Sequence, residues 1–193
     1  MHAEIETYER QGFGASLPLR GPVGLLIVDF VNGFADPEVF GGGNIPAAIA
    51  NTVPLLAAAR ERGWAIAHSR IVYADDDADH NIFSIKVPGM LSLKEKTPNS
   101  AIVAQLAPRA GELVVRKTVP SAFFGTSLAA WLAQRGIQTL LVAGASPAAA
   151  FGPAWSMRCP GASGRWSSRT VSAIARWVRT RQASLTWIRS TRR

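Results

Sequence analysis

The sequence predicts an α/β protein with three layers, α/β/α, built around a central parallel sheet. Short apolar runs alternate with segments of helical period between residues 23 and 144. The runs are continuously apolar, which is typical of strands buried on both faces of a parallel sheet. Polar residues directly follow several runs, and side chains at the carboxyl ends of such strands often carry the chemistry of α/β proteins.

The first half of the chain contains two predicted strands. The expected elements are a helix at 4–10, a strand at 23–30, a helix at 45–62 and a strand at 64–69. Asn44 is a suitable N-cap for the second helix, and Pro46 lies in its first turn. We expect Pro54 to kink this helix or to split its first turn, because proline lacks an N–H donor.

The second half contains two further strands. The expected elements are an irregular stretch at 74–100, a short helix at 101–106, a strand at 112–117, a helix at 126–134 and a strand at 138–144. Gly136 is expected to end the last helix. Residues 75–80, Asp-Asp-Asp-Ala-Asp-His, are expected to form a solvated loop.

The charge of the chain changes abruptly after Ser146. Residues 1–146 contain 12 Lys+Arg and 13 Asp+Glu, whereas residues 147–193 contain nine Arg, no Lys and no acidic residue. The formal net charge of +8 therefore comes from the last part of the chain, which also holds four of the six Trp. This break predicts an enzyme-like domain at 1–146 and a disordered Arg/Trp/Ser-rich tail at 147–193.

Composition narrows the class of protein further. No apolar run approaches the roughly 20 residues of a membrane span, so we expect no membrane partner. The first residues are polar and acidic, unlike a secretory signal, which predicts a cytoplasmic location. The single Cys159 excludes an internal disulfide framework.

Two charged residues end predicted strands. Asp29 closes the apolar run at 23–28, and Lys117 closes the run that starts at Glu112. Taken alone, Asp29 fits a capping carboxylate as well as a functional one. A single lysine such as Lys117 is more commonly a surface residue. Together at one edge of a sheet they predict a carboxylate–ammonium pair beside a nucleophilic thiol. The carboxylate can take the thiol proton, and the ammonium favours the thiolate.

Three segments carry a resemblance to a known family. They are residues 25–32 (Leu-Leu-Ile-Val-Asp-Phe-Val-Asn), 51–60 (Asn-Thr-Val-Pro-Leu-Leu-Ala-Ala-Ala-Arg) and 115–128 (Val-Arg-Lys-Thr-Val-Pro-Ser-Ala-Phe-Phe-Gly-Thr-Ser-Leu). Over roughly residues 5–146 the chain resembles the isochorismatase-like cysteine hydrolases. Residues 117–128 and the Gly-Phe-Gly at 12–14 are most similar to the branch of N-carbamoylsarcosine amidases and maleamate amidohydrolases.

The resemblance implies an Asp–Lys–Cys triad that acts on a small amide. Asp29 would accept the proton and Lys117 would be the ammonium. The family places its cysteine in a Gly-x-x-Thr-Ser-Gly-Cys-Val turn that supplies an oxyanion hole. That nucleophile is absent here, because Ala150 occupies its position, and we interpret Cys159 as incidental.

The same resemblance predicts a homo-oligomer with no cofactor and no metal. Zinc-binding relatives carry a tight Asp-x-His pair and a further histidine, and this spacing does not occur here. His68 is therefore expected to be a core residue. His80 is a candidate for the border of a substrate pocket.

Genetic-code degeneracy explains the missing motif. Codons can be chosen for residues 147–151 (Pro-Ala-Ala-Ala-Phe) so that a one-base shift reads Ser-Gly-Cys-Val, and the codon before it in that frame can encode Thr. In the same shifted frame, residues 186–192 can be read as Asp-Met-Asp-Gln-Lys-Tyr-Ala, a string similar to the family near its C-terminus. The hypothesis is a single-base frameshift near codon 146, and it leaves the chain inactive as it stands.

Two alternatives remain open at this point. The chain can be a non-catalytic remnant of a hydrolase with a basic tail that binds nucleic acid through phosphate contacts and base stacking. It can also be an ordinary isochorismatase acting on an enol ether, although the Phe-Phe-Gly-Thr element at 123–126 fits this reading less well. The amidohydrolase accounts for more of the residues, so nucleic acid is not the expected partner.

Overall fold

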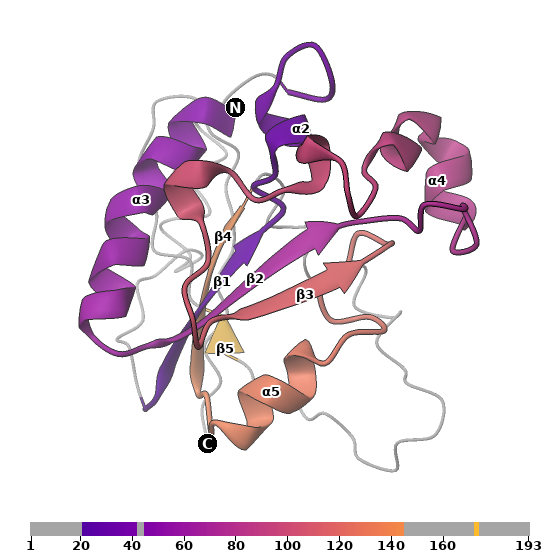
Figure 1. Ribbon diagram of the computed structural model, residues 1–193. Helices are drawn as coiled ribbons and strands as arrows, with labels where there is room; N and C mark the ends of the chain where they lie inside the picture. The colour runs from indigo at the N-terminus through magenta and orange to yellow at the C-terminus, as the bar shows by residue number, and fades with distance from the viewer. Residues whose placement is uncertain (1–20, 42–44, 145–171, 174–193) are drawn as a thin grey trace, which may run out of the picture.

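The structure of the protein, a computed structural model, describes residues 21–41, 45–144 and 172–173. One parallel sheet runs through these residues, with helices on both faces (Figure 1). Its strands are β1 (Val23–Val28), β2 (Ala65–Ile71), β3 (Leu113–Lys117), β4 (Thr139–Gly144) and β5 (Ser172–Ala173). Every pair of neighbouring strands is parallel. The predicted α/β class with a parallel sheet is confirmed.

The order of the strands places β1 at the centre of the sheet. The order is β3-β2-β1-β4-β5, so the chain builds outward from β1 to β3 and then returns to the other side of β1. Val28 at the end of β1 is in register with Ser69 of β2 and with Gly144 of β4. Open α/β sheets bind ligands beyond the carboxyl ends of their strands, at the point where the strand order reverses. That point lies at residue 29.

Alternate residues of β1 face two separate cores. Leu25 and Ile27 pack in the cluster on the side of α3 (Ile45–Glu61), and Leu26 and Val28 pack in the cluster on the side of α5 (Leu128–Gln134). This alternation explains why the run is apolar at every position: both faces of the strand are covered.

Pro54 does not split the second helix, although a split is one of the two outcomes expected there. α3 is one helix of 17 residues with Pro54 inside it. Pro54 has no N–H for the carbonyl of Ala50, which weakens the helix locally. Ile49 and Leu56, on either side of the proline, are both buried against the sheet. Tertiary packing of this kind supplies most of the stability of helices in proteins and outweighs the lost bond.

The stretch predicted to be irregular contains helices. They are α4 (Ile82–Lys86) and the 3-10 helices η1 (Pro88–Ser92) and η2 (Pro98–Ser100). A capping box starts α4, with Asn81 accepting from Phe83 N–H and Ser84 accepting from Asn81 N–H. α4 and η1 pack on a core of their own, formed by Ile71, Tyr73, Met90 and Leu93.

The prediction of a helix at residues 101–106 is correct for only half of these residues. Only η3 (Ala104–Leu106) is helical, and Ile102 instead forms an antiparallel bridge with Val31. The short helix α2 (Asn32–Ala35) follows Val31 directly. A tertiary contact between distant segments has therefore overridden the local preference for helix.

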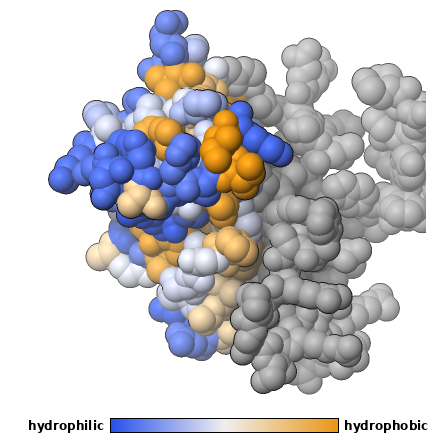
Figure 2. All heavy atoms as spheres, turned by 90° about the vertical axis from the view of Figure 1, so that its right-hand side faces the viewer, coloured by the Kyte–Doolittle hydropathy of each residue, from blue (hydrophilic) through white to orange (hydrophobic). Residues whose placement is uncertain are grey.

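The face that carries α4 presents hydrophobic side chains to the surface. Ile82 and Ile85 are 66% and 60% exposed. Figure 2 shows this face, on which hydrophobic patches lie between hydrophilic groups. In the part of the chain that the structure describes, no helix has the length and apolar character that crossing a membrane requires.

Candidate active site

Asp29 follows the last residue of β1 and is held in a left-handed backbone conformation. Its φ is 57°, a region that Asp and Asn tolerate better than most residues other than glycine. Its N–H donates to the carbonyl of Ser69 at 2.9 Å, and the residue is only 5% exposed. Such a conformation persists where surrounding contacts determine it, and these residues concentrate at functional sites.

Lys117 is the last residue of β3 and points its ammonium at Asp29. Its Nζ donates to Asp29 Oδ2 at 2.6 Å, to the carbonyl of Pro120 at 2.7 Å and to that of Val119 at 3.3 Å. These contacts use all three donors of an ammonium group. The structure thus brings together the two residues that the sequence singled out, although 88 positions separate them.

Burial perturbs the titration of both groups. Desolvation raises the pKa of the Asp29 carboxyl, against the charge and hydrogen bond of Lys117 and a hydrogen bond from Ser69. Desolvation likewise lowers the pKa of the Lys117 ammonium, against the charge of Asp29. A carboxylate with a raised pKa is a stronger base than an ordinary aspartate, which is the property that a proton acceptor needs.

Two residues not predicted from the sequence fix the turn that follows Lys117. Tyr73 Oη donates to the carbonyl of Thr118 at 2.8 Å, and Asn81 Nδ2 donates to the same carbonyl at 3.1 Å. The capping pattern that starts at Asn81 marks the start of α4 in the sequence, but its contact with Thr118 depends on the fold. Together these donors fix the carbonyl of Thr118, the residue just before Val119 and Pro120, whose carbonyls accept from the ammonium.

The end of β4 lies directly against the end of β1. Gly144 is in register with Val28, and a Cβ at Gly144 would lie 2.5 Å from the carbonyl oxygen of Val28. Only glycine fits there, because no side chain can approach a backbone so closely. Ala150, the predicted position of the nucleophile, and Cys159 lie outside the described residues.

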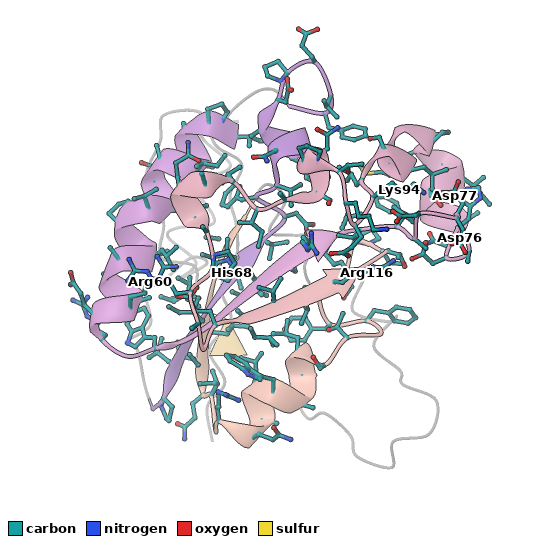
Figure 3. All side chains as sticks on the ribbon, in the orientation of Figure 1. Arg60, His68, Asp76, Asp77, Lys94 and Arg116 are labelled. Atoms are coloured by element: carbon teal, nitrogen blue, oxygen red, sulfur yellow. The ribbon has the colours of Figure 1, made fainter. Side chains whose placement is uncertain are left out.

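A second cluster of charged residues lies on the α3 side of the sheet, away from Asp29. Glu112 accepts from Arg60 Nε at 2.7 Å and from the N–H of Arg109 at 3.0 Å, and it contacts His68 Nε2 at 2.9 Å. Figure 3 shows Arg60 and His68 lying beside one another near the base of α3. His68 is fully buried, in agreement with its prediction as a core residue.

The acidic loop at residues 75–80 is exposed and is tied down by ion pairs. Asp77 pairs with Lys94, and Asp79 pairs with Arg116 at 2.6 Å. Figure 3 shows Asp76, Asp77, Lys94 and Arg116 gathered near α4, far from Arg60 and His68. His80 is exposed in this loop. Among the described residues, no group of His, Cys, Asp and Glu is arranged to hold a metal ion.

Comparison with known proteins identifies the family of the domain that contains the sheet, Asp29 and Lys117. A model of the isochorismatase domain matches residues 23–147, which include the whole sheet from β1 to β4. The chain belongs to the isochorismatase family. The resemblance drawn from residues 25–32 and 115–128 is confirmed.

Two curated relatives in this family are amidases. Maleamate amidohydrolase of Pseudomonas putida KT2440 is 38% identical over 141 residues, covering 72% of this chain and 63% of that protein. N-carbamoylsarcosine amidase of an Arthrobacter species is 29% identical over 156 residues, covering 76% of this chain and 57% of that protein. The chain therefore spans about three fifths of the length of these relatives.

Solved structures support the same fold. The crystal structure of an isochorismatase family protein from Desulfovibrio vulgaris subsp. vulgaris str. Hildenborough superposes with a TM-score of 0.57 at 34% identity. The match covers 65% of this chain and 67% of that chain. The parallel sheet with its flanking helices is thus the isochorismatase-like α/β fold.

Proposed function

We propose that residues 1–146 are the larger part of a cysteine amidohydrolase that cleaves a small amide or N-carbamoyl compound bearing a carboxylate. The observation that carries this proposal is the buried contact of 2.6 Å between Lys117 Nζ and Asp29 Oδ2 at the switch point of the sheet. An ion pair that only stabilises the fold can lie anywhere in the core, whereas a proton acceptor for a bound substrate must lie where ligands bind, beyond the carboxyl ends of the strands. A left-handed aspartate is also typical of functional sites.

The proposed reaction proceeds through a thioester. A thiol in the turn after β4 gives its proton to Asp29, and its sulfur attacks the carbonyl carbon of the amide. The proton then passes to the leaving nitrogen, so that ammonia departs and the thioester forms. Water attacks the thioester, releasing the acid and returning the thiol. Lys117 stabilises the negative charge that alternates between Asp29 and the sulfur.

The substrate class rests on the two curated relatives. One is named for maleamate and the other for N-carbamoylsarcosine. Both substrates combine a cleavable C–N bond with a carboxylate, and we infer the same combination here. The working enzyme is proposed to be a cytoplasmic homo-oligomer that uses no cofactor and binds no nucleic acid.

The chain as it stands is proposed to be inactive, because Ala150 occupies the position of the nucleophile. A one-base frameshift near codon 146 accounts both for this loss and for the tail of nine arginines without an acid. Without a thiol in the turn, Asp29 has no proton to take. Sequencing the gene across codons 140–160 tests this directly, since codons that cannot encode Thr-Ser-Gly-Cys in the shifted frame would exclude the frameshift.

Turnover tests the proposal more fully. The chain as it stands and a frame-restored chain are assayed for ammonia release from maleamate and N-carbamoylsarcosine. We expect turnover from the restored chain alone, and its loss by at least about 100-fold in an Asp29→Asn variant, since general acid–base catalysis contributes about that much. Asparagine keeps the shape and tolerates the left-handed backbone, so the fold is preserved.

Two controls test whether a frameshift has removed the nucleophile and its turn. Ala150→Cys in the unrepaired chain supplies a thiol without the Thr-Ser-Gly turn and should remain inactive, because the donors of the oxyanion hole are missing. Activity of the unrepaired chain that disappears with Cys159→Ala would show that the nucleophile has been assigned to the wrong position.

A further inference from the structure

Ser69 is a polar residue in an otherwise apolar row of the sheet. It lies on β2, in register with Val28 of β1 and with Val115 of β3. Both valines belong to the core on the α5 side, and Ser69 is only 1% exposed. A buried hydroxyl in such a row costs stability unless it has a hydrogen-bond partner.

The partner of Ser69 is Asp29. Ser69 Oγ donates to Asp29 Oδ1 at 3.3 Å, and the carbonyl of Ser69 accepts the N–H of Asp29 at 2.9 Å. β2 lies between the strands that carry Asp29 and Lys117, so Ser69 sits between the two members of the pair. One residue thus holds both the backbone and the side chain of Asp29.

The two carboxylate oxygens of Asp29 are held differently. Oδ2 accepts from the ammonium of Lys117, whose other two donors are taken by the carbonyls of Val119 and Pro120. Lys117 therefore has no donor left for Oδ1, and Ser69 is the side chain on the described residues that donates to it. A carboxylate oxygen has two acceptor positions, so one remains open on Oδ1.

We propose that Ser69 is a positioning residue that holds Asp29 so that Oδ1 receives the proton of the nucleophile. This inference rests on the proposed function. Oδ2 also keeps one acceptor position, but a proton there would lie directly beside the ammonium of Lys117, whereas a proton at Oδ1 lies on the other oxygen, away from that positive charge. The hydroxyl of Ser69 stabilises the ionised carboxylate before the transfer. It can rotate once Oδ1 is protonated, because a hydroxyl both donates and accepts.

Threonine and valine at position 69 form a matched pair of variants. Both add the same methyl group to a buried strand position that favours β-branched residues, and they differ in the hydroxyl alone. Any effect of the added methyl group is therefore common to Ser69→Thr and Ser69→Val. Ser69→Ala, which adds no volume, provides the same test against the parent chain should the methyl prevent folding.

The first measurement uses the chain as it exists. The side-chain carboxyl of Asp29 is titrated by carbon NMR, with Asp29→Asn identifying its signal. We expect the carboxyl to titrate at higher pH in Ser69→Val than in Ser69→Thr, because the valine variant loses a donor to the ionised form. Equal midpoints in the two variants would overturn the proposal.

The second measurement uses the frame-restored chain. We expect Ser69→Val to lower kcat roughly tenfold relative to Ser69→Thr with KM unchanged, because the hydroxyl no longer holds Oδ1 of Asp29 in position for the proton of the nucleophile. The acidic limb of its pH–rate profile should also move to higher pH. Equal kcat values would again overturn the role of Ser69. A restored parent without turnover would refute the proposed function, while the titration would still decide whether Ser69 controls the protonation of Asp29.

Discussion

Two clusters of buried charge lie on the same sheet, and they affect stability in opposite ways. Asp29 and Lys117 lie at the carboxyl edge with side-chain exposures of 7% and 0%. Arg60, His68 and Glu112 lie on the α3 side, where Arg60 keeps 17% exposure. The first cluster is drier and has fewer donors for its carboxylate. The contrast distinguishes an ion pair that costs stability from one that provides it.

The Glu112 cluster stabilises the fold near neutral pH. Burial alone would raise the pKa of Glu112, but hydrogen bonds from Arg60, the backbone of Arg109 and His68 outweigh it and lower the pKa to about 2. The folded pKa thus lies below the ordinary value of 4.5. This stabilisation is present above pH 4.5 and is lost as the pH falls through about 2.

The Asp29–Lys117 pair affects the stability of the fold near neutral pH in the opposite direction. The pKa of Asp29 is raised by burial above its ordinary value of 3.8. Its contribution to stability is therefore present below pH 3.8 and is lost as the pH rises through the folded-state pKa. The pKa of Lys117 is lowered by burial, so its contribution is present above 10.5 and is lost as the pH falls. At neutral pH the charged forms of both groups therefore cost stability.

The largest loss of stability is expected from a variant that removes one member of the Asp29–Lys117 pair. Lys117→Met leaves a buried carboxylate without its cation and should lower the free energy of unfolding by about 3–5 kcal/mol. The double variant Asp29→Asn/Lys117→Met removes both charges and should recover to within about 1 kcal/mol of the parent. Urea unfolding at pH 7 measures both. A double variant as unstable as the single one would mean that packing, and not uncompensated charge, controls this position.

The next largest loss of stability is expected from a variant that weakens the cluster of Arg60, His68 and Glu112. Glu112→Gln keeps the shape but loses the charge that Arg60 and His68 contact, and should cost about 2 kcal/mol in the same experiment. Glu95→Gln is the matched control, because Glu95 pairs with Arg70 but is 44% exposed. Exposed pairs contribute at most about 1 kcal/mol. Equal losses in the two variants would contradict the distinction between the buried and the exposed pair.

The smallest effect concerns pH. Burial lowers the pKa of His68 below 6.5, against the hydrogen bond and charge of Glu112. Protonation would also add an N–H at Nδ1, which is buried and has no partner among the described residues. The unfolded chain therefore binds this proton more tightly, and stability should fall as the pH drops below 6.5.

The variant His68→Gln isolates this effect. Glutamine retains a donor for Glu112 and does not titrate, so the loss of stability between pH 7 and pH 5 should be smaller than in the parent chain. Unfolding free energies measured by urea at each pH give the comparison. Identical slopes in the parent and the variant would assign the pH dependence to other groups.

The sequence by itself determined the order of the strands β1 to β4, the helices α3 and α5 between them, and the family. Continuous apolar runs must be buried on both faces, which requires a parallel sheet with helices on each side. Asp29 and Lys117 were identified because each ends such a run, and the carboxyl ends of parallel strands meet at one edge. Their contact of 2.6 Å agrees with this argument, and their catalytic roles stay predictions.

Only the tertiary structure decided which polar groups meet across the sheet. Arg60 and Glu112 are 52 positions apart, and Ser69 and Asp29 are 40 positions apart. Arg60, Glu112 and Ser69 look like ordinary surface or strand residues in the sequence, because nothing local marks their partners. The helix at 45–61 also continues through Pro54, a residue that disfavours the interior of a helix. In each case the deciding energy comes from burial between distant segments, which exists only once the sheet has formed.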